Sequence, residues 1–209
     1  MDKMNEFQTK MKCLKSRFIE SAKELLECVD SINSANYNDL IINAIKCLAM
    51  QKNYSSLKLN WVEMSNIETS KDKHRATYLK YDSFLRMFRY RDHEVGNYIR
   101  TSGWYFFVKR ATGSIDYIGV GGTKTGKLNS YNDLYHRISQ HFGTGSGATF
   151  FNNYYRDGDV PSREDWVKTL KENYDLMVIY AKEGDIGEDD LYVVESFFNG
   201  IFQPKYNRQ

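Results

Sequence analysis

The sequence of 209 residues predicts an α+β fold: a small, mixed or antiparallel three-stranded sheet flanked by helices, preceded by an N-terminal helical extension. Three observations indicate this fold. Apolar residues recur at helical spacing through much of the first hundred residues. Two β-rich runs then follow one another across a turn-forming Ala-Thr-Gly-Ser, and a third, strongly apolar run comes later. The chain therefore divides into an extension over residues 1–100 and a sheet-bearing domain over residues 101–209.

The extension is predicted to be mostly helical. Residues 4–32 place apolar side chains every three or four positions, with lysines and glutamates on the other face. A second helix is expected over residues 39–50, with Asn38 or Asp39 as its N-cap. A third helix is expected over residues 78–98. Between the second and third, the segment LKLNWVEM is typical of either a short strand or a helix end.

The sheet-bearing domain is predicted to alternate strands and helices. Its segments are, in chain order, strands over 104–109 and 115–120, a helix over 131–142, an aromatic-bearing loop over 151–164, a helix over 165–172, a strand over 174–181 and a helix over 191–202. The first two strands form a hairpin, because turn-forming residues lie directly between them. The last helix ends before Pro204, since proline cannot continue a helix.

Composition narrows the class of protein. The formal net charge of +2 neither requires nor excludes a nucleic-acid partner, because a nuclease needs only a local basic groove. The three cysteines, Cys13, Cys28 and Cys47, form no CxxC pair, which favours a reduced intracellular protein and argues against zinc. The polar start has no signal peptide, and no apolar run approaches the ~18 residues of a membrane span. We therefore expect a cytoplasmic protein.

Residues 116–128, DYIGVGGTKTGKL, allow a nucleotide-binding interpretation. GGTKTGK fits the phosphate-cradling pattern G-x-x-x-x-G-K. However, Leu128 follows Lys127 where a Ser or Thr would reach magnesium, and turn formers rather than a helix come next. The strand–helix–strand repeats of a nucleotide-binding sheet are also missing. We therefore expect no nucleotide cofactor.

The predicted hairpin carries two tripeptides, Gly103-Trp104-Tyr105 and Tyr117-Ile118-Gly119. With Arg137 on the following helix and Glu195 on the last one, they resemble the GIY-YIG nuclease family, whose signature tripeptides lie on adjacent strands of a small sheet. The order and spacing of the four elements agree with that family. The resemblance covers residues 101–209, about half the chain.

Two further residues resemble the type II restriction endonucleases within this family. His141 lies four residues after Arg137, and Asn207 lies in the ending PKYN. One departure is Trp104 in place of isoleucine. That side chain should point into the core, where an aromatic residue is tolerable.

The resemblance implies a role for each residue in phosphodiester hydrolysis. Tyr105 would be the general base, Tyr117 would orient the water or the phosphate, and Arg137 would stabilise the transition state. A tyrosine with a pKa of about 10 is a poor base, so a nearby cation must help, or His141 must take its proton. Glu195 would hold Mg²⁺ or Mn²⁺, since a carboxylate is the hard oxygen ligand that magnesium prefers. Taken singly, strand tyrosines more often serve packing.

Other residues are candidates for binding DNA: Lys124, Lys127, Asn152, Asn153 and Arg156. The two lysines would contact phosphates or would only be solvated. The aromatic segment over 143–156 would read bases or wedge a base step, or it would fold onto the core through its aromatic rings.

The sequence thus predicts a Mg²⁺-dependent endonuclease for double-stranded DNA, most like a type II restriction enzyme. Such enzymes act as dimers, and the N-terminal helices would then serve dimerisation or DNA wrapping. Alternatives within the family are a homing endonuclease and a repair or structure-specific nuclease. A non-catalytic nucleic-acid-binding protein of the same fold is the alternative from another class.

Overall fold

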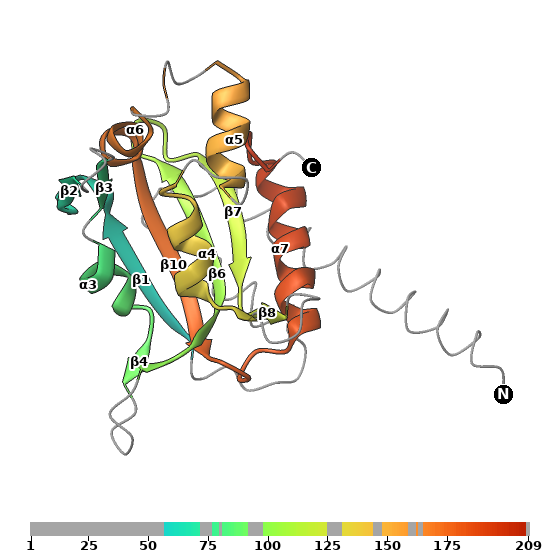
Figure 1. The fold of residues 1–209 in the computed structure, drawn as a ribbon. Helices are drawn as coiled ribbons and strands as arrows, with labels where there is room; N and C mark the ends of the chain where they lie inside the picture. Colours follow the sequence, from blue (N-terminus) through green and yellow to red (C-terminus); the bar gives the residue numbers. More distant parts are fainter. Residues whose placement is uncertain are drawn as a thin grey trace, which may run out of the picture. The chain divides into compact units, whose positions relative to one another are not determined.

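The computed structural model describes residues 57–71, 77–79, 81–91, 98–124, 131–143, 148–158, 162 and 165–207 (Figure 1). All of them belong to one compact unit, Tyr54–Gln209. The helices expected over 4–32 and 39–50 lie outside the described residues. None of the helices in this described part has the length and apolar content needed to cross a bilayer.

Four antiparallel strands form the main sheet, in the order β1-β10-β6-β7. They are β1 (Lys58–Glu63), β6 (Thr101–Lys109), β7 (Ile115–Gly121) and β10 (Tyr174–Lys182). The last three are the strands that the sequence predicts, so the α+β class is confirmed. The expected count of three strands was wrong, because LKLNWVEM supplies the fourth strand. The sheet-bearing unit therefore begins before residue 100, where the sequence placed the boundary.

The pairing of β10 explains why LKLNWVEM becomes a strand. Eight of the nine residues of β10 are buried, and β6 pairs with only one of its edges. Buried backbone N–H and C=O groups must find partners, so the other edge of β10 needs a strand as well. β1 fills it in register from Lys58↔Tyr180 to Glu63↔Asp175.

Helices and short hairpins surround the sheet. The α-helices described are α3 (Tyr81–Arg86), α4 (Leu134–Gln140), α5 (Thr149–Arg156), α6 (Trp166–Asn173) and α7 (Glu188–Phe202). A 3₁₀ turn, η2 (Met64–Asn66), follows β1. The two-stranded sheets join β2 (Thr69–Lys71) to β3 (Thr77–Leu79), β4 (Tyr90–Arg91) to β5 (Tyr98–Ile99), and β8 (Thr123–Lys124) to β9 (Tyr131–Asn132).

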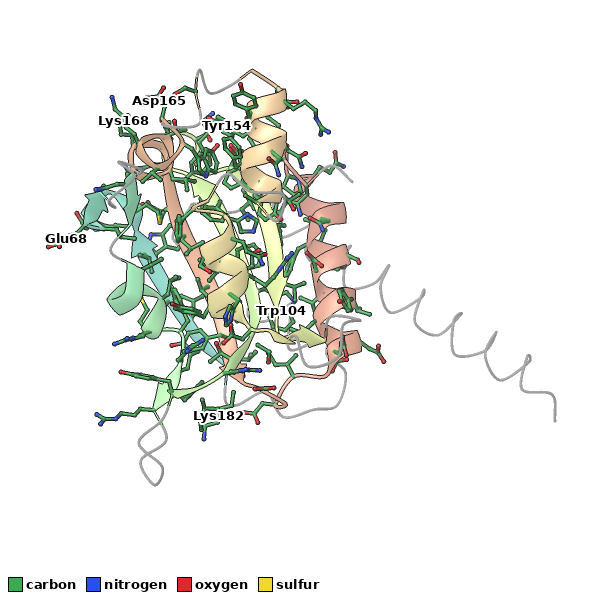
Figure 2. The ribbon with its side chains drawn as sticks, viewed as in Figure 1. Glu68, Trp104, Tyr154, Asp165, Lys168 and Lys182 are labelled. Carbon is green, nitrogen blue, oxygen red and sulfur yellow. The ribbon has the colours of Figure 1, made fainter. Side chains whose placement is uncertain are left out.

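Different helices cover the two faces of the sheet (Figure 1). Along β6, Tyr105 and Phe107 alternate with Trp104 and Phe106, because successive side chains of a strand point to opposite faces. Tyr105 and Phe107 belong to the core that α3, α4, α5 and α6 cover. On the other face, the buried indole of Trp104 donates to the Leu191 carbonyl of α7 at 2.9 Å (Figure 2). The structure therefore accommodates an aromatic residue at position 104.

The helix expected over residues 78–98 is shorter than predicted. α3 ends at Arg86, and a hairpin follows in which Tyr90 pairs with Ile99. The Tyr90 ring also packs against Tyr180 of β10, with ring centroids 6.0 Å apart. This contact with a distant strand overrides the local helical pattern.

The aromatic loop expected over residues 151–164 was wrong in its first part, which forms α5. Phe150, Phe151 and Tyr154 are buried on one side of this helix. In a helix these three side chains lie on one side and pack together against the core. In an extended segment, successive side chains would point in opposite directions and could not all do so. The helix escaped prediction because its N-cap is Ala148, whose side chain cannot cap.

Candidate functional site

The two tyrosines of the tripeptides project from the same face of the sheet. Tyr105 pairs with Gly119 and Phe107 pairs with Tyr117, so Tyr105 and Tyr117 are diagonal neighbours on β6 and β7. Residues that lie opposite in an antiparallel pair share a face. Their rings are nearly parallel, with centroids 6.3 Å apart and an interplanar angle of 29°. The two tyrosines therefore share one face of the sheet.

The glycine of the second tripeptide makes room for Tyr105. A Cβ atom built on Gly119 would lie 2.2 Å from Cζ and the hydroxyl oxygen of Tyr105. Gly103 has a comparable constraint, because its φ is +155° and a Cβ there would lie 2.1 Å from the Ile179 carbonyl oxygen. Both glycines are thus required by close approaches within the sheet.

Tyr105 and His141 form a buried hydrogen bond. The tyrosine hydroxyl lies 2.6 Å from Nε2 of His141, and neither residue is exposed. His141 is the C-cap residue of α4, and its backbone carbonyl accepts from the Trp166 indole at 2.6 Å. The other ring nitrogen, Nδ1, is buried and finds no hydrogen-bond partner among the described residues. A fixed imidazole is therefore available to exchange a proton with Tyr105.

Burial keeps this pair uncharged in the free protein. Burial, together with the smaller effect of the positive charge of Arg137, lowers the pKa of His141 from 6.5 to about 3. Burial also raises the pKa of Tyr105 well above 10 and that of Tyr117 to about 12. Arg137 opposes both of the tyrosine shifts. The site thus needs additional positive charge before either phenol can ionise.

Arg137 is the cation of the site. It lies on α4 and is half-buried. Its Nε donates to the Val120 carbonyl of β7 at 3.4 Å, and Nη1 donates to the Gln140 side chain at 3.1 Å. No carboxylate among the described residues pairs with it. The guanidinium therefore keeps donors for a phosphate, which its planar fork suits.

Glu195 brings a carboxylate to the same group of side chains. It is half-buried on α7, and burial raises its pKa from 4.5 to about 7, while Arg137 opposes the rise. The negative charge of Glu195 in turn raises the pKa of Tyr105 and of Tyr117, so the carboxylate lies within electrostatic range of both tyrosines. A buried carboxylate without an ion pair is costly, and a bound cation would relieve that cost.

The donor set fits magnesium only in its hydrated form. No cluster of three His, Cys, Asp or Glu residues in the described part of the chain could hold a metal ion. Mg²⁺ commonly binds through one or two carboxylates and takes its other ligands from water and substrate phosphate. Glu195 alone can satisfy that requirement, whereas a closed protein cage is excluded for these residues.

Asn207 braces the second tripeptide. Its side-chain amide donates to the Ile118 carbonyl at 2.6 Å and accepts from the Ile118 N–H at 2.7 Å. β7 is an edge strand, so this amide takes the place of the next strand. Both polar groups of Asn207 are thereby committed to the backbone. Its geometry is that of a positioning residue, not of one that contacts the reacting atoms.

The residues expected to bind DNA are dispersed. Asn153 is buried, donates to the Tyr206 carbonyl at 2.7 Å and accepts from Arg156 at 2.8 Å. It therefore stabilises the C-terminal tail and is not exposed for base recognition, because α5 is a packed helix. Asn152 is half-buried and Arg156 is exposed on α5. Lys124 lies in β8, and Lys127 lies outside the described residues.

Two supporting residues were missed from the sequence. Asp133 caps α4 by accepting from the His136 N–H at 2.9 Å, and it is fully buried beside Arg89 at 3.0 Å. An aspartate just before a helical run is a recognisable N-cap signal. Phe150 stacks on Tyr117 with centroids 5.1 Å apart. No sequence signal could have found this contact, since it joins a helix to a distant strand.

The site therefore combines a tyrosine–histidine pair, a second tyrosine, one arginine and one half-buried glutamate. They come from β6, β7, α4 and α7, and their charges perturb one another. Such mutual perturbation in a buried cluster is typical of functional sites. Comparison with models of protein families, with curated proteins and with solved structures finds no match for this chain.

Proposed function

We propose that the protein is a Mg²⁺- or Mn²⁺-dependent endonuclease of GIY-YIG type that hydrolyses phosphodiester bonds in double-stranded DNA. The observation that carries the proposal is the 2.6 Å bond from the Tyr105 hydroxyl to His141, beside Tyr117 and near Arg137, which pairs with no described carboxylate. A buried tyrosine in contact with a neutral imidazole is an arrangement for moving a proton. A structural tyrosine would need only a carbonyl as its partner.

The protein's residues can divide the chemistry as follows. The guanidinium of Arg137 binds the scissile phosphate and stabilises the charge that develops on it. The Tyr105 oxygen accepts a proton from the attacking water while its own proton passes to Nε2 of His141. Burial opposes the imidazolium that results, and the phosphate's negative charge compensates for it. Tyr117, stacked beside Tyr105, orients the water or the phosphate.

Glu195 is the residue that would hold the metal ion. When bound, the ion supplies positive charge that lowers the pKa of a nearby water and neutralises the phosphate. Its charge would also lower the pKa of Tyr105, which Arg137 alone leaves well above 10. The raised pKa of Glu195, about 7, means that metal binding must displace a proton at neutral pH.

Sequence-specific restriction is the role within this class that we favour. To cut both strands of a palindrome, the enzyme would act as a homodimer. To reach DNA inside the cell, it would be located in the cytoplasm. A homing or repair nuclease would use the same residues. A non-catalytic DNA-binding protein would not need the Tyr105–His141 bond.

The test is cleavage of mixed plasmid and phage DNA with Mg²⁺ or Mn²⁺. Discrete fragments are the expected result, and a smear would instead favour a repair or structure-specific enzyme. The Glu195→Gln variant keeps the shape of the side chain and should bind DNA without cutting it. The exposed Glu172→Gln variant on α6 is the matched control and should cut normally. Absence of cleavage by the wild-type chain with either metal would contradict the proposal.

A further inference from the structure

We propose that a cluster of cations at one end of the sheet is a second contact surface for the backbone of duplex DNA. The inference rests on the proposed function, in that it takes DNA as the polymer bound. The cluster, called here the Tyr90 surface, consists of Lys58, Arg86, Tyr90, Arg91, Tyr98 and Lys182. It lies where β1 begins and β10 ends, with the β4–β5 hairpin beside it (Figure 1; Figure 2 labels Lys182).

Tyr90 gathers two lysines from different strands. The Lys58 ammonium lies 4.4 Å from the centre of the Tyr90 ring, and the Lys182 ammonium lies 5.6 Å from it. Two like charges repel at such distances, and the negative face of the ring offsets part of that repulsion. The tyrosine therefore fixes two positive charges in one place, where free lysine side chains would spread apart.

Tyr98 extends the surface with two arginines. The Arg86 guanidinium lies 5.9 Å from the centre of the Tyr98 ring, and Arg91 pairs with Tyr98 across the β4–β5 hairpin. Tyr98 is 45% exposed, which is high for a large aromatic side chain. Exposed aromatic rings interleaved with cations are a pattern found on nucleic-acid-binding surfaces.

The four cations of the surface have no carboxylate partner among the residues that the structure describes. Lys58, Arg86, Arg91 and Lys182 are exposed, and none forms an ion pair among the described residues. Other cations of the unit differ, since Arg89 pairs with Asp133 and Arg110 pairs with Asp175.

Among the described residues around the surface, cations outnumber carboxylates. The described residues nearby include a further cation, Arg100, whose carbonyl accepts from the Glu183 N–H at 3.0 Å. Two carboxylates, Glu183 and Asp185, follow Lys182 along the chain. Within the described part of the chain, the four cations of the surface and Arg100 outnumber these two carboxylates. Such a local excess attracts a polyanion even though the net charge of the chain is only +2.

The register of the sheet puts the surface on the same side as the catalytic tyrosines. Lys58 pairs with Tyr180, and Tyr180 pairs with Gly103, which is two residues from Tyr105. Opposite residues share a face, so Lys58 projects to the face that carries Tyr105. Three strand spacings of about 4.8 Å separate β1 from β7, or roughly 14 Å. This is close to the ~12 Å width of a major groove, so one duplex can contact both places.

The experiment measures binding, without cleavage, to a labelled duplex of random sequence by fluorescence anisotropy in EDTA, between 50 and 200 mM salt. The test variant is Lys58→Gln/Arg91→Gln/Lys182→Gln. The matched control is Lys109→Gln/Lys168→Gln/Lys171→Gln, which removes the same charge from the opposite end of the sheet. If three phosphate contacts are lost, the slope of log K against log salt should fall by about 2.7, with binding weaker on the order of 100-fold at 0.1 M salt.

The control should keep the wild-type slope, and the charge-preserving variant Lys58→Arg/Lys182→Arg should keep most of it. An unchanged slope in the test variant, or an equal loss in test variant and control, would overturn the inference. Preferential loss of single-stranded DNA binding would also overturn it, because the surface is assigned to a duplex. Cleavage is scored separately. If the wild-type chain cuts DNA but the test variant keeps the wild-type salt slope, only the second contact surface is refuted. If the wild-type chain does not cut DNA but the test variant has a reduced salt slope, only the proposed nuclease function is refuted.

Discussion

The stability of this unit should depend on two buried groups with opposite responses to pH. The folded-state pKa of His141 is lowered from 6.5 to about 3, so its contribution to stability is lost as the pH falls below 6.5. The folded-state pKa of Glu195 is raised from 4.5 to about 7, so its cost is relieved as the pH falls through 7. Between pH 7.5 and 5, the two effects oppose each other.

The magnitudes follow from the same shifts. At pH 5, His141 lies 1.5 units below its ordinary pKa, which corresponds to a loss of about 2 kcal/mol. Glu195 would gain about 2.4 kcal/mol over the same interval, and solvent around its half-buried side chain reduces this to about 1–2 kcal/mol. The two single variants should therefore diverge. His141→Gln should gain about 2 kcal/mol, relative to wild type, on going from pH 7.5 to 5, and Glu195→Gln should lose about 1–2 kcal/mol.

Urea unfolding followed by tryptophan fluorescence measures both changes. The three tryptophans, Trp61, Trp104 and Trp166, all lie in the described unit, so the signal reports on this unit alone. Glutamine at position 141 can still accept from Tyr105, and the pH-dependent difference is independent of any constant loss of stability. If His141→Gln and wild type changed in parallel within about 0.5 kcal/mol, the buried neutral histidine would be refuted.

Three further predictions concern the residues around Tyr105. Tyr105→Phe removes the proposed general base and should slow single-turnover cleavage at least about 100-fold. It should also lower the thermal stability by about 1–3 kcal/mol, because neither ring nitrogen of His141 would then have a hydrogen-bond partner among the described residues. An unchanged cleavage rate would show that Tyr105 takes no part in the chemistry. Gly119→Ala should destabilise the unit by more than about 2 kcal/mol, since its Cβ would lie 2.2 Å from the Tyr105 ring, and Tyr105→Ala in the same chain should relieve most of that loss in a thermal melt. Asn207→Asp cannot donate to the Ile118 carbonyl, so kcat should fall while the Kd for DNA stays within about threefold; a selective effect on Kd would argue against a positioning role.

Much of the sheet-bearing unit could be predicted from local pattern. The hairpin of β6 and β7, the strand β10 and the helices α6 and α7 each have a period and a boundary that are visible in the sequence. The parity of Tyr105 and Tyr117 also follows from the hairpin, since alternation along a strand is a local property. These elements succeed because neighbouring residues in the sequence decide them.

The elements that failed depend on distant partners. LKLNWVEM forms β1 because β10 requires a second neighbour, and nothing in its own composition chooses strand over helix end. The β4–β5 hairpin interrupts a helical pattern because Tyr90 packs on Tyr180. α5 has no polar N-cap and forms because three aromatic side chains are buried together.

The sequence by itself determined which chemical groups this unit carries and which segments carry them. Tyrosines on a hairpin, an arginine with a histidine one turn later, and a glutamate on an apolar helix are all visible in the sequence. Only the tertiary structure decided their electrostatic state, because a pKa depends on burial and on charges brought from other elements. It joined Tyr105 to His141 and committed Asn207 to the edge of β7, since these contacts connect residues far apart along the chain. It also left Arg137 without an ion pair to any described carboxylate.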